Sequence, residues 1–190
     1  MSINKRVEKR KTERMPDLSF RVMTIMFNVI DFLYPYVKKR VKRFDISAGM
    51  TVIDYGCGPG RYSSKFAELV GKKGRVYALD IHELAIAAVK KKIEKYNLKN
   101  VQPVLVDGYN STLPDNIADV TCTIDMFWSI KNPTEFLQEI RRITKKDGTL
   151  VVDDGHQRRS ATKMKILYSG IWNIVEETND HLKCKPRGPA

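Results

Sequence analysis

The chain has 190 residues, a hydrophobic content of 42% and a formal net charge of +12. This length is sufficient for one sizeable core and short for two, and the hydrophobic content suits a soluble globular domain. No uninterrupted apolar stretch is long enough to span a bilayer, and the basic N-terminus lacks the apolar region of a secretory signal. The three cysteines, Cys57, Cys122 and Cys184, are not clustered. We therefore expect a cytoplasmic protein without a metal site.

The first 45 residues carry most of the excess charge. They contain 12 Lys and Arg residues against 5 Asp and Glu residues, so they hold +7 of the +12. We interpret residues 1–16 as a basic, flexible leader and residues 17–45 as a helical cap of one or two helices, broken near Pro35. Such an arm could bind nucleic acid, an anionic membrane or an acidic substrate. Alternatively, it is a solvated tail followed by helices whose apolar side chains pack in the core.

A glycine-rich segment follows the first predicted strand. The continuously apolar run from Met50 to Tyr55 is typical of a buried parallel strand. Gly56, Gly58 and Gly60 then allow the backbone to turn sharply and to approach a ligand closely. Beyond them the apolar spacing predicts a helix from about Arg61 to Val70. This order of strand, glycine-rich turn and helix is typical of a nucleotide-type site at the carboxyl end of a strand.

The glycine spacing disfavours two common nucleotide sites. A dinucleotide fingerprint would need its third glycine at Arg61, and the Lys-Ser/Thr pair of a P-loop is absent. The segment Val52–Gly60 instead resembles motif I of class I S-adenosylmethionine (SAM)-dependent methyltransferases. It is especially similar to the methyltransferase type 11 branch, which includes ubiquinone- and menaquinone-biosynthesis-type enzymes. The resemblance covers about residues 46–185.

This resemblance implies both a fold and a cofactor. The expected fold is α/β: a Rossmann-like, seven-stranded, mostly parallel sheet with helices on both faces and a C-terminal antiparallel hairpin, in a SAM-binding domain at residues 46–186. The implied cofactor is SAM, with S-adenosylhomocysteine as the product. The helix that begins near Gly60 offers free N–H groups to the carboxylate of SAM. The cofactor-binding candidates within motif I are Asp54, Gly56, Cys57, Gly58 and Gly60.

The second predicted strand, Arg75–Leu79, ends in an acid. This residue, Asp80, lies twenty positions after Gly60, where Rossmann-like sites place a carboxylate that accepts hydrogen bonds from the ribose hydroxyls. By the resemblance, the neighbouring Ile81 lines the adenine. The next residue, His82, begins a predicted helix, and we expect its side chain to be exposed.

The third and fourth predicted strands also deliver acids to the same edge of the sheet. Val101–Val106 is followed by Asp107 and Gly108, and Asp107 resembles the family acid that binds the adenine amino group, since a carboxylate accepts from an amino group. Ile117–Ile124 is followed by Asp125, at the end where open α/β sheets place their chemistry. Asp107, Gly108 and Asp125 are therefore further cofactor-binding candidates.

The four residues from Asp125 to Trp128 bear on the acceptor. Methyltransferases that act on nucleobase amino groups carry Asp/Asn-Pro-Pro-aromatic here, so the lack of proline argues against that reaction. Many small-molecule relatives carry a histidine where this chain has Trp128, which we interpret as a wall of the substrate pocket. In the family, the N-terminal helices also help to form this pocket, which makes Phe27 and Tyr34 substrate-pocket candidates.

The C-terminal part supplies one more candidate, His156, which follows the fifth strand. Either His156 or Asp125 could act as a base near the methyl donor. Methyl transfer does not require such a base, because the donor carries the driving force. The remaining predicted elements are a helix from Pro133 to about Lys145, a turn at Lys146–Gly148, a strand at Thr149–Val152, a helix at Ser160–Tyr168 and a hairpin of Gly170–Glu177 with Leu182–Lys185.

The leading hypothesis is a SAM-dependent methyltransferase that acts on a small, apolar or membrane-associated molecule. One alternative is an RNA or protein methyltransferase that uses the basic arm to hold a polyanion, and it predicts salt-sensitive binding. A second alternative is a non-catalytic SAM-binding scaffold. An NAD oxidoreductase is disfavoured by the glycine spacing.

Overall fold

The structure is a computed structural model, and it describes residues 14–34 and 36–188. Its strands are β1 (Thr51–Tyr55), β2 (Arg75–Asp80), β3 (Val101–Leu105), β4 (Ala118–Thr123), β5 (Thr144–Val152), β6 (Trp172–Glu177) and β7 (Leu182–Pro186). Its helices are α2 (Asp17–Leu33), α3 (Tyr36–Val41), α4 (Arg61–Val70), α5 (Glu83–Tyr96), the short 3-10 helix η1 (Phe127–Ser129), α6 (Pro133–Ile143) and α7 (Arg159–Ser169).

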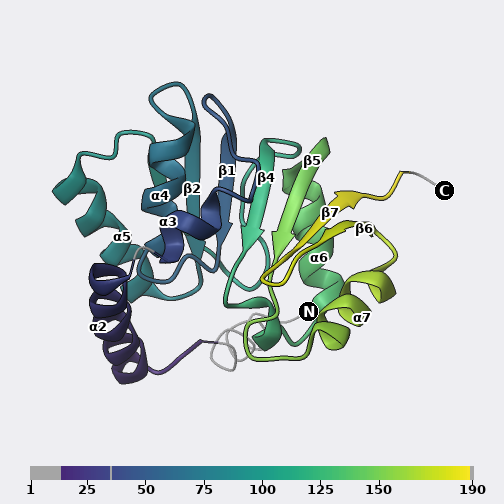
Figure 1. The fold of residues 1–190 in the computed structure, drawn as a ribbon, viewed down its shortest axis with the longest axis horizontal. Coiled ribbons are helices and arrows are strands. Elements are labelled where there is room, and N and C mark those ends of the chain that lie inside the picture. Colours follow the sequence, from purple (N-terminus) through teal and green to yellow (C-terminus); the bar gives the residue numbers. More distant parts are fainter. Residues whose placement is uncertain (1–13, 35, 189–190) are drawn as a thin grey trace.

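The strands form one seven-stranded sheet in the order β3-β2-β1-β4-β5-β7-β6 (Figure 1). The five strands from β3 to β5 are parallel, whereas β7 is antiparallel to both β5 and β6. The strand order reverses between β1 and β4, and ligands bind at such a switch point in open α/β sheets. The predicted seven-stranded, mostly parallel sheet with a C-terminal antiparallel hairpin is thus confirmed.

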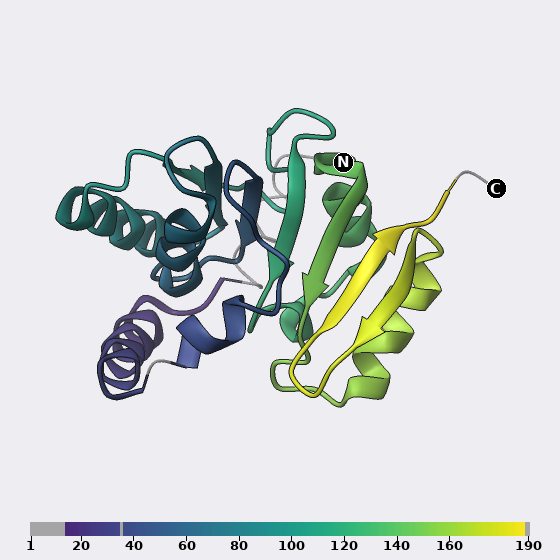
Figure 2. The same ribbon diagram turned by 45° about the horizontal axis from the view of Figure 1, so that its top comes forward.

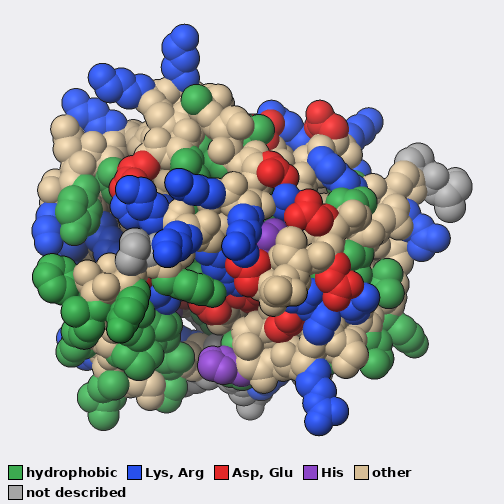
Figure 3. All heavy atoms as spheres, in the orientation of Figure 1, with side chains coloured by type: hydrophobic (Ala, Val, Ile, Leu, Met, Phe, Trp, Pro, Cys, Tyr) green, Lys and Arg blue, Asp and Glu red, His purple; other side chains and the backbone are tan. Residues whose placement is uncertain are grey.

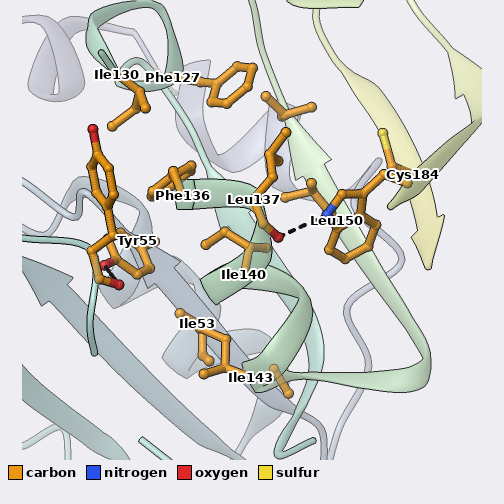
Figure 4. Packing of buried hydrophobic residues seen from close by; sticks show 14 of the residues in the cluster. Ile53, Tyr55, Phe127, Ile130, Phe136, Leu137, Ile140, Ile143, Leu150 and Cys184 are labelled. Atoms are coloured by element: carbon orange, nitrogen blue, oxygen red, sulfur yellow. Dashed lines mark hydrogen bonds between the residues drawn. The ribbon is translucent and has the colours of Figure 1, made fainter. Parts of the chain in front are cut away.

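Helices cover both faces of the sheet because successive strand residues point to opposite sides. In β1, Val52 packs in a cluster with α3 and α4, whereas Ile53 packs in a cluster with α6 and α7. On the first face, α5 also packs its Val89 against β2. Figure 2 shows α6 and α7 behind the sheet and α3 in front of it. In the α6 cluster, the buried Trp172 donates a hydrogen bond from its indole nitrogen to the Leu137 carbonyl at 3.2 Å (Figure 4).

The fifth strand is longer than the sequence pattern indicates. We predicted a turn at Lys146–Gly148 and a strand from Thr149, but α6 ends at Ile143 and β5 begins at Thr144. The pairing of β4 with β5 shifts register between Ala118 and Val120, which accommodates the polar residues. A side chain on Gly148 would lie 2.6 Å from a Thr144 methyl carbon, so this position requires glycine for close packing rather than for a turn.

The side chain of His82 is buried, which corrects the expectation that it is exposed. Its Nδ1 accepts a hydrogen bond from the Leu84 amide at 3.2 Å and caps α5, and its ring lies 4.5 Å from that of Phe20 in α2. Burial lowers the pKa of His82. The local pattern could not reveal this contact, because Phe20 is brought to His82 only by the tertiary placement of α2.

The N-terminal helices have the predicted interruption, since α2 ends at Leu33 and α3 begins at Tyr36. In Figure 1 the arrowheads of β4 and β5 point to the lower edge of the sheet, and α2 lies at the lower left. Within the described part of the chain, no helix has the length and apolar character needed to cross a membrane. The predicted leader at residues 1–16 lies almost entirely outside the described residues.

Candidate functional site

The glycine-rich loop connects β1 to α4 with a backbone that side chains would obstruct. Gly56, Gly58 and Gly60 have φ values of 77°, 50° and 73°, in the left-handed region that favours glycine. A Cβ on Gly56 would also lie 2.6 Å from the side chain of Met126, so the segment after β4 packs directly against the loop. Gly60 is the N-cap of α4 and has no side chain to cap it, which leaves amides of the first turn for a ligand.

Asp80 is tied to this loop by hydrogen bonds to both of its carboxylate oxygens. Oδ2 accepts from the Gly58 amide at 2.9 Å, and Oδ1 accepts from the His82 amide at 2.8 Å. Burial raises the pKa of Asp80 to about 6, and the bonds from Gly58 and His82 oppose that rise. A carboxylate has about four acceptor positions, so Asp80 retains capacity for a donor such as a ribose hydroxyl.

The other predicted cofactor residues surround Asp80 in different ways. Asp54 lies beneath the loop, where it accepts a 2.5 Å hydrogen bond from the Ser63 hydroxyl, and burial raises its pKa to about 7. Ile81 is partly buried against the α6 cluster. Asp107 is exposed and forms an isolated bridge with Asn110, and the neighbouring Val106 amide donates to the Asp80 carbonyl at 2.9 Å.

Cys57 and Gly108 complete the set of predicted cofactor residues. Cys57 is buried in the loop, and its amide donates to the Leu79 carbonyl at 2.9 Å, which fastens the loop to β2. Gly108 has a φ of 64° and nothing within 4 Å of the position a Cβ would take. The three cysteines of the chain are all free and buried. Among residues 14–34 and 36–188, no group of three or more His, Cys, Asp or Glu side chains is arranged to hold a metal ion.

Asp125 is positioned by a buried polar chain that sequence reasoning missed. Its amide donates to Asp153 Oδ1 at 2.9 Å, and Asp153 Oδ2 accepts from Arg40 Nη2 at 2.8 Å. Arg40 Nη1 in turn donates to the Tyr62 hydroxyl at 2.8 Å. Burial raises the pKa of Asp153 to about 6, and Asp125 adds to that rise while Arg40 opposes it. The only sequence signal for Asp153 is its position after an apolar strand. Arg40 lies in a run of basic residues, and nothing in the sequence distinguishes it from its neighbours.

His156 and Trp128 lie together at the end of β5. Their rings are 5.0 Å apart and perpendicular, and both side chains are exposed. The Trp128 indole nitrogen also donates to the Asp125 carbonyl at 3.2 Å. A Cβ on Gly155 would lie 2.2 Å from the Trp128 ring, so glycine is required where the two segments meet. The structure therefore groups Trp128 with the two base candidates, whose roles stay predictions.

The cap helix α2 is attached to the start of α4. Asp31 accepts two hydrogen bonds from Arg61, at 2.8 and 2.7 Å, and Arg61 lies over the Phe27 ring at 4.0 Å. Arg61 occupies the position at which a dinucleotide fingerprint would have its third glycine. The same residue that disfavours NAD binding therefore anchors the cap helix α2. Phe27 thus lies beside the glycine-rich loop, whereas the Tyr34 side chain is 67% exposed at the end of α2.

The fold matches the folds of solved methyltransferases. A SAM-dependent methyltransferase from Aquifex aeolicus is 28% identical, with a TM-score of 0.68 over 78% of this chain and 87% of that one. Coclaurine N-methyltransferase bound to N-methylheliamine and S-adenosylhomocysteine is 27% identical, with a TM-score of 0.56 over 63% of this chain and 34% of that one. These matches and the sheet order define a class I SAM-dependent methyltransferase.

The methyltransferase-domain family matches residues 46–183, and the chain belongs to this family. Among its curated relatives, a demethylmenaquinone methyltransferase from Bacillus mycoides is 28% identical in a 155-residue match that covers 76% of this chain. Another demethylmenaquinone methyltransferase, from Shouchella clausii, is 30% identical over 116 residues. The matched region spans 63% and 48% of the lengths of these two relatives. These matches agree with the branch of the family that motif I resembles.

Proposed function

We propose that this protein transfers a methyl group from SAM to a small apolar acceptor, of the demethylated quinol type that its curated relatives are named for. The assignment of SAM as the cofactor is supported chiefly by the hydrogen bond that the Gly58 amide donates to Asp80 at the carboxyl end of β2. A carboxylate fixed beside an uncapped helix start fits a ligand with a ribose diol and an amino-acid carboxylate. When bound, SAM supplies an activated methyl group on a sulfonium.

The residues of this chain would bind and orient rather than perform covalent chemistry. Asp80 would accept hydrogen bonds from the ribose, and the α4 amides would receive the carboxylate of SAM. Asp125, Trp128 and His156 would border the acceptor, with His156 or Asp125 able to take a proton from a hydroxyl or carbon acid. Alignment of the acceptor is the main contribution that such a site can make.

One observation supports an apolar acceptor, and a second argues against a nucleobase acceptor. The cap helix α2, which is bonded to the first residue of α4, carries a row of exposed apolar side chains. The residues after β4 lack the prolines that accompany methylation of nucleobase amino groups. An apolar molecule could reach the site along such a surface while its reactive ring is held near Asp125.

The test is transfer of label from methyl-tritiated SAM to a panel of acceptors. We expect label in the organic extract only when a demethylated naphthoquinol or benzoquinol with a short prenyl tail is supplied under reducing conditions. Bulk RNA and denatured cell protein are the parallel acceptors. Transfer of label to either of them would replace this proposal with the alternative of an RNA or protein methyltransferase. SAM binding without transfer to any acceptor would instead indicate a non-catalytic SAM-binding scaffold.

The Asp31–Arg61 bond predicts that Asp31→Asn loosens the cap helix. Arg61 is buried and would keep its charge without a charged partner, so we expect a loss of about 1–3 kcal/mol in the free energy of unfolding. Urea denaturation measures this loss, and limited proteolysis locates it if cleavage begins in α2. The matched control is Glu68→Gln in α4, the helix that begins with Arg61. This variant removes an exposed ion pair with Lys65 and should cost less than about 0.5 kcal/mol. Equal losses for both variants would contradict an anchoring role.

A further inference from the structure

The cap helix α2 exposes most of its apolar side chains. Among its described residues Phe20 alone is buried, and Phe32 is 89% exposed. Figure 3 shows the resulting apolar patch at the lower left of the molecule, over α2. Contiguous apolar patches of this kind on a protein surface usually mark an interaction site. The large apolar side chains that form the patch are Leu18, Val22, Ile25, Met26, Val29, Ile30, Phe32 and Leu33.

The surface next to this patch is positively charged. Arg21, Lys38, Lys39 and Lys42 are exposed and form no ion pair within the described part of the chain. The three acids of the cap, Asp17, Asp31 and Asp45, are instead bonded to Arg14, Arg61 and Lys183. Basic side chains lie beside the apolar patch in Figure 3. A partner that covers the patch would therefore also meet unneutralised cations, which favours an anionic partner.

The order of residue types along the cap distinguishes a lipid surface from other anionic partners. The apolar residues of α2 are followed by Tyr34 and Tyr36, which are 67% and 49% exposed, and then by the basic residues of α3. Tyrosines between an apolar and a basic zone are typical of the membrane–water interface. An RNA would neutralise the lysines but leave the apolar side chains in water, and a second copy would bring the same cations together.

We propose that α2 and α3 dock this protein on an anionic lipid surface. The apolar side chains of α2 enter the boundary between headgroups and acyl chains, and Lys38, Lys39 and Lys42 contact the headgroups. Because Asp31 holds α2 to Arg61 at the start of α4, docking places the glycine-rich loop next to the membrane. This proposal concerns binding alone and does not depend on which acceptor is methylated.

The test is flotation of the full-length chain with vesicles, without SAM or acceptor. We expect binding to vesicles of about one part phosphatidylglycerol to three parts phosphatidylcholine, and much weaker binding to phosphatidylcholine alone. The apolar variant Phe32→Gln/Leu33→Gln and the charge variant Lys38→Glu/Lys39→Glu should each weaken binding by about tenfold or more. All four side chains are exposed, so circular dichroism should show unchanged folding.

Matched controls carry the same changes elsewhere on the surface. Leu167→Gln/Tyr168→Gln alters exposed apolar residues of α7, and Lys72→Glu/Lys73→Glu alters exposed lysines after α4. Both should bind vesicles like the native chain. The proposal is overturned if the native chain ignores anionic vesicles, or if controls and test variants weaken binding equally. It is also overturned if the apolar variant converts a dimer into a monomer and leaves vesicle binding unchanged. A third contrary result is that RNA abolishes vesicle binding by competition while the apolar variant binds vesicles like the native chain.

Discussion

Replacing Asp80 by alanine is expected to weaken SAM binding by about a hundredfold or more. The variant removes the carboxylate that would accept the ribose hydroxyls, and hydrogen bonds to a charged group contribute about 1.5–3 kcal/mol each. It also removes the acceptor of the Gly58 amide, so the glycine-rich loop loses a tether to β2. Isothermal titration calorimetry with SAM and with S-adenosylhomocysteine measures both affinities, and both should fall together.

Two controls separate this role from a general loss of structure. Asp147→Ala removes an exposed carboxylate from the amino-terminal half of β5 and should leave binding unchanged. Asp80→Asn tests the charge. Because burial raises the pKa of Asp80 to about 6 and the ribose requires the ionised form, native affinity should fall by about tenfold per pH unit below 6. The asparagine variant should bind weakly at every pH without that slope. A folded Asp80→Ala chain with native affinity would contradict the assignment.

The features predictable from sequence are those that local spacing encodes. A strand followed by Gly56, Gly58 and Gly60 predicts a turn at the end of β1. The position of Asp80 at the end of β2 is predicted from its distance from this turn within the same strand–helix–strand unit. The break between α2 and α3 follows from Pro35, which cannot continue a helix. The seven-stranded order required the family resemblance, since apolar periodicity alone does not specify which strands are neighbours.

The features that sequence missed depend on contacts between distant segments. His82 looked like an exposed helix start, but α2 places Phe20 against it. Arg40 looked like one more member of a basic run, yet it is buried on Asp153, which is 113 positions later in the chain. Long-range pairs of this kind leave no periodic pattern. They also determine how the cap helices sit against the glycine-rich loop, which is why the exposed face of α2 could not be predicted.

Replacing Asp153 by alanine is the variant for which we expect the largest loss of stability. Asp153 and Arg40 are both about 5% exposed or less, and breaking a buried ion pair by removing one partner costs about 3–5 kcal/mol. The variant leaves the Arg40 charge uncompensated and leaves the Asp125 amide without its acceptor. Urea denaturation of both chains at the same pH measures the difference in the free energy of unfolding.

The double variant Arg40→Met/Asp153→Leu shows whether charge or packing causes this loss. Removing both charges together avoids an unpaired buried ion, so the double variant should be less destabilised than Asp153→Ala, even though Tyr62 and the Asp180 carbonyl lose their donor. It should still lose methyl transfer, because nothing then holds the Asp125 amide where β4 meets the site. If the double variant is as unstable as Asp153→Ala, packing and not the buried charge holds these segments together. If it keeps full activity, the chain from Arg40 to Asp125 stabilises the fold without positioning the site.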